Sequence, residues 1–240
     1  MRCVYLLAAL VAPVGPATAQ TEAPQMLTYT PTPSDEVLLN PGMGLYLQAG
    51  GRFGYRPSPD EWYLPIADIA YYRGDWSALN PEEGVYHFDE YFRPIFDFWV
   101  GELRKRVAFR FMSESMHSNT PYVTPKWVFD KGVPFAEHVG LYAEKQYDPV
   151  FWDERYLDVH CEFIHKLGEY LDGREGLEFI DIGSIGEWGE MHLMRWTPEQ
   201  LEATGFTEAR YAMAYRRVID AFVDAFPHTR GFLNIGGRDR

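Results

Sequence analysis

The sequence predicts an α/β fold in which parallel strands alternate with helices. Short β-branched and apolar segments recur along the chain, and longer segments with an apolar stripe at helical spacing separate them. The segment 177–182, LEFIDI, has the composition of a strand that is buried in a parallel sheet. Such alternation gives either a barrel or an open doubly wound sheet, and the sequence contains no G-x-G-x-x-G or phosphate-binding loop to support the second.

Each element has its own signal. Strands are expected over 44–48, 66–72, 107–111, 177–182 and 231–235. Between them, apolar stripes predict helices from Phe88 to Leu103, from Tyr156 to Leu171 and from Tyr211 to Phe226. A capping box with proline at the first helical position, Thr197-Pro-Glu-Gln200, predicts one further helix.

The predicted fold is of the (β/α)8 TIM-barrel type, truncated after five strands. A complete barrel usually needs about 250 residues, and more where loops are long, as between 113 and 152. Because the fifth strand lies almost at residue 240, the predicted strands cannot close into a barrel. We therefore expect residues 40–240 to form a barrel that is incomplete at its C-terminus. The alternative is a short open α/β domain.

The N-terminus has the pattern of a bacterial signal peptide over residues 1–19. Arg2 supplies a basic start, 4–14 is apolar, and Ala17-Thr-Ala19 is an A-x-A cleavage signal, after which 20–39 is an N-terminal extension. An uncleaved membrane anchor is the alternative, although the apolar run is short for a bilayer. The sequence thus predicts a secreted or periplasmic protein with no membrane association after cleavage.

Composition narrows the expected partners. Cys161 is the only cysteine outside the predicted signal peptide, so no internal disulfide is expected in the mature chain. The net charge is −13, which argues against nucleic acid as a partner. The sequence does not indicate an oligomeric state.

The turn after the fourth predicted strand has the most distinctive sequence. Gly183, Gly186 and Gly189 interrupt the strand and present two carboxylates, Glu187 and Glu190. Residues just beyond the C-terminal ends of barrel strands line the active site, so both are candidate catalytic residues. Alternatively, either glutamate caps the turn or pairs with Arg195.

Further polar residues at strand ends are candidates for substrate binding. Arg73 and Asp75 follow the second predicted strand, Arg110 lies in the third, and Glu114 and His117 follow it. Arginine can orient a carboxylate or a sugar hydroxyl with its planar donors. The alternative is a buried ion-pair network that joins neighbouring strands.

Tryptophans in predicted loops are candidates for stacking on sugar rings. Trp76, Trp127 and Trp188 are placed there, and flat aromatic faces suit amphipathic ligands. The alternative for each is packing in the core. Trp76 and Trp188 are favoured because they adjoin the polar candidates.

No metal or other cofactor is expected. The seven histidines are scattered without an H-E-x-x-H motif. Glu187, Glu190 and His192 form only a weak three-ligand set, and Ser184 does not lie in a G-x-S-x-G elbow.

Three segments resemble the clan A glycoside hydrolases, in particular the bacterial β-galactosidase-like barrels. They are 40–46, NPGMGLY, 72–89, YRGDWSALNPEEGVYHFD, and 186–190, GEWGE. The resemblance implies a (β/α)8 barrel, retention of configuration, an acid/base glutamate after strand four and a nucleophilic glutamate after strand seven. Glu187 matches the acid/base, whereas Gly186 replaces the asparagine that usually precedes it. The nucleophile would lie beyond residue 240.

The expected function is therefore an exported glycoside hydrolase that cleaves an oligo- or polysaccharide with two carboxylates. One carboxylic acid protonates the leaving oxygen, and a second carboxylate attacks or stabilises the sugar carbon. If Glu190 faces the cleft while Glu187 pairs with an arginine, the two glutamates exchange roles. The alternatives are a carbohydrate-binding barrel without activity and a metal-dependent hydrolase.

Overall fold

A computed structural model of the chain describes residues 30, 44–48 and 56–233. The predicted signal peptide 1–19, the extension 20–39 apart from residue 30, and the motif residues 40–43 lie outside the described residues. So do residues 234–235 of the fifth predicted strand. The described residues 44–48 and 56–233 belong to one compact unit.

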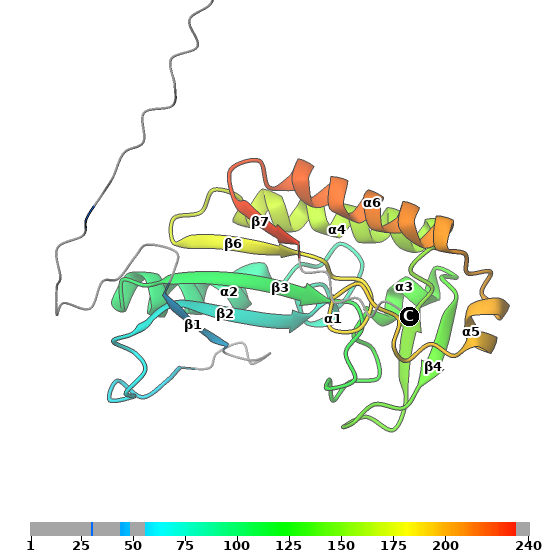
Figure 1. The fold of residues 1–240 in the computed structure, drawn as a ribbon, viewed down its shortest axis with the longest axis horizontal. Helices are drawn as coiled ribbons and strands as arrows, with labels where there is room; N and C mark the ends of the chain where they lie inside the picture. Colours follow the sequence, from blue (N-terminus) through cyan, green and yellow to red (C-terminus); the bar gives the residue numbers. More distant parts are fainter. Residues whose placement is uncertain (1–29, 31–43, 49–55, 234–240) are drawn as a thin grey trace, which may run out of the picture. The chain divides into compact units, whose positions relative to one another are not determined.

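All five predicted strands form one parallel sheet (Figure 1). Their order in the sheet is the same as their order in the chain, and each neighbouring pair is parallel. A doubly wound sheet reverses direction at a switch point, whereas a barrel adds each strand on the same side of the last. The predicted fold class is thus confirmed for the described residues. The strands are β1 (Leu45–Gln48), β2 (Ala67–Asp75), β3 (Arg106–Met112), β6 (Leu177–Ile182) and β7 (Arg230–Leu233).

The predicted helices are present, and the first of them changes from an α-helix to a π-helix along its length. It runs as an α-helix, α2 (Phe88–Phe96), and continues as a π-helical segment, η1 (Asp97–Glu102). Side-chain caps begin the later helices, including the predicted capping box at Thr197. No helix among the described residues has the length and apolar character needed to cross a membrane. The other helices are α1 (Trp76–Leu79), α3 (Lys126–Asp130), α4 (Glu154–Leu171), α5 (Pro198–Ala203) and α6 (Glu208–Ala225).

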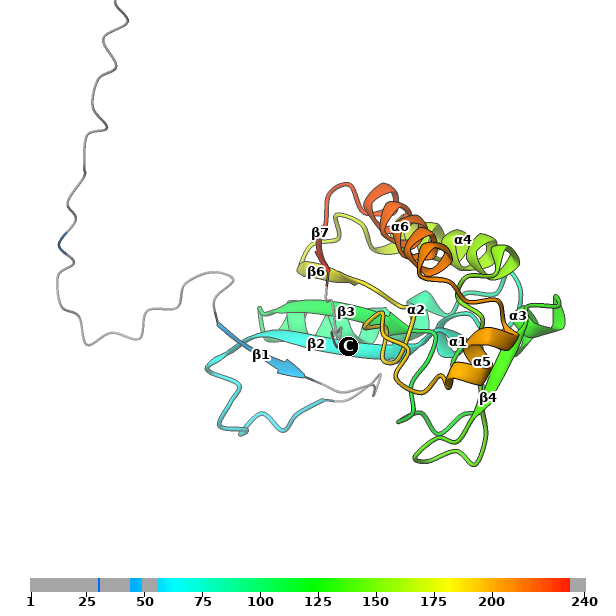
Figure 2. The ribbon, with the colours of Figure 1, turned by 45° about the vertical axis from the view of Figure 1, so that its right-hand side comes forward.

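The long connection between β3 and α4 contains a hairpin that the sequence did not predict. β4 (Phe135–His138) and β5 (Gln146–Pro149) pair antiparallel. Each strand has four residues, too few for an alternating pattern to stand out. With α3 and α5, this region lies beyond the C-terminal ends of the sheet strands (Figures 1 and 2).

The two faces of the sheet bury different side chains. Phe109, Phe111 and Ile180 point to the outer face and join the large core that the helices cover. Tyr71 and Ala108 belong to a small cluster on the inner face. Because side chains alternate along a strand, the inner face also carries Arg73, Arg110 and Asp181 toward the C-terminal end.

The helices α4 and α6 lie side by side over β6 and β7 (Figures 1 and 2). Their close approach depends on Gly168, where an added Cβ would lie 2.3 Å from the carbonyl oxygen of Ala225. A backbone atom cannot move aside as a flexible side chain does, so this position requires glycine.

We expect Gly168→Ala to destabilise the protein, because the methyl group forces α4 and α6 apart. The loss should be about 1–3 kcal/mol, the usual range for overpacking. Gly101→Ala is the matched control, since the nearest atom to its added Cβ is 3.9 Å away. Urea denaturation of both variants measures the effect, and equal midpoints would contradict the tight contact.

Candidate active site

The turn after β6 has an unusual backbone. Three residues other than glycine have positive φ: Ser184 at 76°, Trp188 at 55° and Met191 at 62°. Such conformations are uncommon and persist only where the surroundings enforce them. Here Trp188 N–H donates to the Glu114 carbonyl at 3.1 Å, and Glu187 N–H donates to the His192 carbonyl at 3.0 Å. These bonds fix the direction of each side chain in the turn.

Glu187 is fully buried and is not among the residues that line the cavity at the C-terminal ends of β2 and β3. Its Oε1 accepts a hydrogen bond from Met116 N–H at 2.7 Å, and its Oε2 lies 2.8 Å from Arg195 Nε. Burial raises the pKa of this carboxyl, while the Arg195 charge opposes the rise. The structure therefore places Glu187 against Arg195, which is the alternative arrangement stated for it above.

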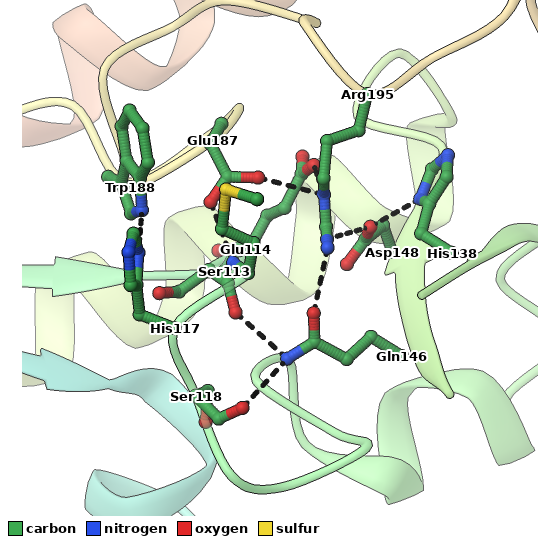
Figure 3. A network of polar contacts seen from close by, with 12 residues as sticks. Ser113, Glu114, His117, Ser118, His138, Gln146, Asp148, Glu187, Trp188 and Arg195 are labelled. Atoms are coloured by element: carbon green, nitrogen blue, oxygen red, sulfur yellow. Dashed lines mark hydrogen bonds and ion pairs between the residues drawn. The ribbon is translucent and has the colours of Figure 1, made fainter. Parts of the chain in front are cut away.

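Arg195 is the centre of a buried ion cluster with three carboxylates (Figure 3). Its Nε lies 3.1 Å from Glu114 Oε1, and its Nη2 contacts Asp148. His138 Nδ1 lies 2.5 Å from the same Asp148. Burial, followed by the charges of Asp148 and Glu187, raises the pKa of Glu114 well above its ordinary value. The single charge of Arg195 does not balance three buried carboxylates, so the pKa of Glu114 is raised in spite of its contact with the guanidinium group.

The same cluster contains the one group of potential metal ligands found among the described residues. Ligand atoms of Glu114, His138 and Asp148 lie within 4.8 Å of one another. The Arg195 guanidinium already contacts both carboxylates and supplies the positive charge. Of the set considered from the sequence, His192 lies 4.0 Å from Glu190, whereas Glu187 points to Arg195.

A cavity of about 970 Å³ opens at the C-terminal ends of β2 and β3. Five of the predicted site residues line it: Arg73, Asp75, His117, Trp188 and Glu190. Arg73 and Asp75 belong to β2 itself, which extends three residues beyond the prediction. The sequence did not single out the other lining residues, which are Gln48, Met112, Ser115, Ser118, Asn119 and Tyr142.

Aromatic rings form one wall of the cavity. Trp188 donates its indole N–H to His117 Nδ1 at 2.9 Å (Figure 3), and the two ring centroids are 5.5 Å apart. Nδ1 of His117 is therefore the acceptor nitrogen of the ring. Tyr142, on the connection between β4 and β5, continues the wall with its ring 6.3 Å from His117.

Glu190 faces the cavity and is held by two arginines. Its Oε1 lies 2.8 Å from Arg110 Nη1 and 3.5 Å from Arg73 Nη2. Arg110 is buried, with 2% of its side chain exposed, and also pairs with Asp181 at 2.8 Å. A charge-assisted hydrogen bond from a guanidinium group holds a carboxylate firmly in place. Arg110 thus adopts the buried ion-pair arrangement considered above, and it positions Glu190.

Trp76 and Trp127 lie away from the cavity. Trp76 is fully buried, and its ring packs 5.2 Å from Phe163 in the helix-covered core. The strand ends at Asp75, which faces the cavity, and Trp76 begins α1 with its ring in the helix-covered core. Trp127 is half-buried beside Trp76, and its indole N–H donates to the Asn80 carbonyl at 3.1 Å. The structure therefore places both tryptophans in packing contacts, which was the alternative for each of them.

Replacing Arg195 should be strongly destabilising. In Arg195→Met the buried carboxylates lose their cation, and removing one partner of a buried pair typically costs about 3–5 kcal/mol. Arg93→Met is the control, since Arg93 pairs with Asp89 on the surface and should contribute below about 1 kcal/mol. Urea denaturation compares the two, and similar losses would contradict the importance of the cluster.

The raised pKa of Glu114 predicts how stability depends on pH. A carboxyl with a raised pKa in the folded state stabilises most below its unfolded value of 4.5, and this contribution is lost as pH rises through the folded pKa. We therefore expect the free energy of unfolding of Glu114→Gln to rise relative to that of the unmodified protein as pH increases above 4.5. Thermal unfolding across a pH series measures this difference. Parallel curves for the two proteins would show that Glu114 does not hold the proton.

Comparisons with known proteins give structural similarity only. No protein-family model matches the chain, and no curated protein does. Three similar solved structures each align with about 70% of this chain: GH5_18 from Streptomyces cattleya in complex with GlcNAc (16% identity, TM-score 0.42, 35% of that chain covered), endo-glycoceramidase II from Rhodococcus sp. (16%, 0.44, 40%) and a β-galactosidase from the Antarctic haloarchaeon Halorubrum lacusprofundi (12%, 0.44, 32%). The chain spans about a third to two fifths of the length of these glycoside hydrolases, and at such identities the likeness concerns the fold alone.

Proposed function

We propose that the protein is an exported glycoside hydrolase that binds an oligo- or polysaccharide in the cavity beyond β2 and β3. The observation that carries the proposal is the combination of an aromatic wall with carboxylates in one cavity. Trp188 and Tyr142 offer flat faces for sugar rings, while Ser118, Asn119 and Gln48 offer hydrogen-bonding groups for hydroxyls. The resemblance of the GEWGE turn to clan A enzymes supports the same reading.

The proposed chemistry is a retaining, two-carboxylate reaction. Cleavage of a glycosidic bond passes through an oxocarbenium-like state, which a carboxylate on the sugar carbon stabilises. Glu190 is the carboxylate of the turn that faces the cavity, where Arg110 and Arg73 contact it. The resemblance assigns the acid/base role to Glu187. Since Glu187 pairs with Arg195, we give that role to Glu190, the glutamate of the turn that lines the cavity.

Two variants in one turn test this assignment. Glu190→Gln should lower kcat by roughly 10² to 10⁴, the range for removing a positioned acid or base, while the protein remains folded. Glu187→Gln is the matched control and should change thermal stability more than kcat, because its carboxyl lies in the buried cluster. Hydrolysis is measured on a panel of aryl glycosides and on plant and algal polysaccharides.

The opposite result is equally informative. If Glu187→Gln abolishes activity in a folded protein and Glu190→Gln does not, the role returns to Glu187 as the resemblance implies. Binding of oligosaccharides by the unmodified protein without any cleavage would favour the alternative of a carbohydrate-binding barrel. Restoration of activity by an added divalent metal would favour the metal-dependent alternative.

A further inference from the structure

We propose that Tyr142 forms a second sugar-binding position at the edge of the cavity, so that the protein binds a chain of linked sugar units more tightly than a single sugar. This inference rests on the proposed function and deepens it, because it names the residue through which the length of the substrate affects binding. Trp188 provides the first sugar-binding position, in the turn after β6 that also carries Glu190.

Tyr142 is an exposed aromatic residue at the cavity. Its fractional exposure is 71%, and it lies in the connection between β4 and β5, outside the central sheet. It lines the same cavity as Trp188 and Glu190. A flat and largely uncovered ring in that place offers the apolar face on which a sugar ring can stack.

The two aromatic residues of the cavity present separate faces. The ring centroids of Trp188 and Tyr142 lie 5.5 Å and 6.3 Å from that of His117. In the described part of the chain, no ring contact joins Trp188 to Tyr142 directly. Each of the two rings therefore remains open to a sugar unit of its own.

The connection that carries Tyr142 is bonded to the wall of the cavity. Leu141 N–H donates to the Met116 carbonyl at 2.8 Å, so the residue before Tyr142 is attached to the segment that follows β3. Met116 lies between Ser115 and His117, which both line the cavity. This hydrogen bond keeps the tyrosine beside the cavity.

Gln146 fixes the other end of the connection (Figure 3). Its side chain is fully buried, and its Nε2 donates to the carbonyls of Ser115 at 2.9 Å and Ser118 at 3.2 Å. Its Oε1 accepts a hydrogen bond from Arg195 Nη1 at 2.8 Å, which joins β5 to the ion cluster. Tyr142 thus belongs to a loop that is held at both ends. A ligand does not have to order this loop, so less of the binding free energy is lost.

Trp62 is an aromatic residue of similar exposure without this setting. Its fractional exposure is 77%, but it is not among the residues that line the cavity. Its ring packs edge-on against the neighbouring Tyr63 at 5.9 Å. Single exposed aromatic residues are common on protein surfaces, so the place of Tyr142 carries the inference and its exposure alone does not. Trp62 is therefore the matched control.

The test is the length dependence of oligosaccharide binding in the full chain, measured by isothermal titration calorimetry. The probes are thio-linked series built from glucose, mannose or galactose, which resist cleavage and are extended one sugar unit at a time from the monosaccharide. The affinity of the unmodified protein should rise by roughly 3- to 10-fold at the length that reaches Tyr142, as expected for one aromatic stacking contact. Tyr142→Ala should lose this rise and keep its affinity for the shorter members.

Three further variants make the test specific. Tyr142→Phe keeps the ring and should retain the rise in affinity with length. Trp62→Ala removes an exposed ring outside the cavity and should bind every member as the unmodified protein does. Tyr142→Gln repeats the test without an aromatic ring if Tyr142→Ala does not fold.

The outcomes separate this inference from the proposed function. An unchanged rise in Tyr142→Ala, or no rise in the unmodified protein, overturns the second sugar position and leaves the proposed function intact. An equal loss of affinity for every member, including the monosaccharide, also overturns it, because the cavity as a whole would then be disturbed. If the rise is lost as expected in a protein that cleaves no glycoside, the sugar position stands and the proposed hydrolysis fails. If no sugar is bound or cleaved, both fail.

Discussion

The ion cluster around Arg195 is the interaction on which the site depends. It joins the turn after β6, through Glu187, to the segment after β3, through Glu114, and to β5, through Asp148. These segments are far apart in the sequence, and none of them is held by long regular structure. Burying three carboxylates is costly, and the cost is tolerable only because one guanidinium contacts all of them and hydrogen bonds satisfy part of the rest. The segments that meet at the cavity are therefore held together by buried ion pairs and hydrogen bonds, and not by apolar packing.

The ion cluster around Arg195 explains why two glutamates three residues apart have different environments. Glu187 points into the cluster, and the positive φ of Trp188 then reverses the chain so that Glu190 reaches the cavity. Arg110, from the inner face of β3, contacts both the Trp188 carbonyl and the Glu190 carboxylate. The strained turn is thus stabilised from one side by Arg195 and from the other by Arg110.

Much of the fold could be predicted from the sequence, because apolar periodicity reports directly on which face of an element is buried. The five parallel strands and the long helices α4 and α6 follow from that signal. The hairpin of β4 and β5 could not be predicted, since its strands are too short to show a period.

The site was predictable only in part. Residues at strand ends were found because they follow an apolar run, and Arg73, Asp75, His117, Trp188 and Glu190 do share a cavity. The orientations of Glu187 and Glu190 could not be read from the sequence, because they depend on backbone angles that only the folded neighbours enforce. The inward side of Asp75 could have been inferred from the alternation of side chains, had β2 been extended to its true end.

The origin of Tyr142 has a consequence for how such a site can diversify. This ring comes from the connection between β4 and β5, whereas Glu190 lies in the turn after β6 and Asp75 ends β2 of the central sheet. Insertions or deletions at the tip of the hairpin would widen or narrow the opening without disturbing the carboxylates or the sheet that supports them. Under the proposed function, selectivity and reactivity would therefore lie in separable segments, so that the accepted sugar could change while the carboxylates stay the same.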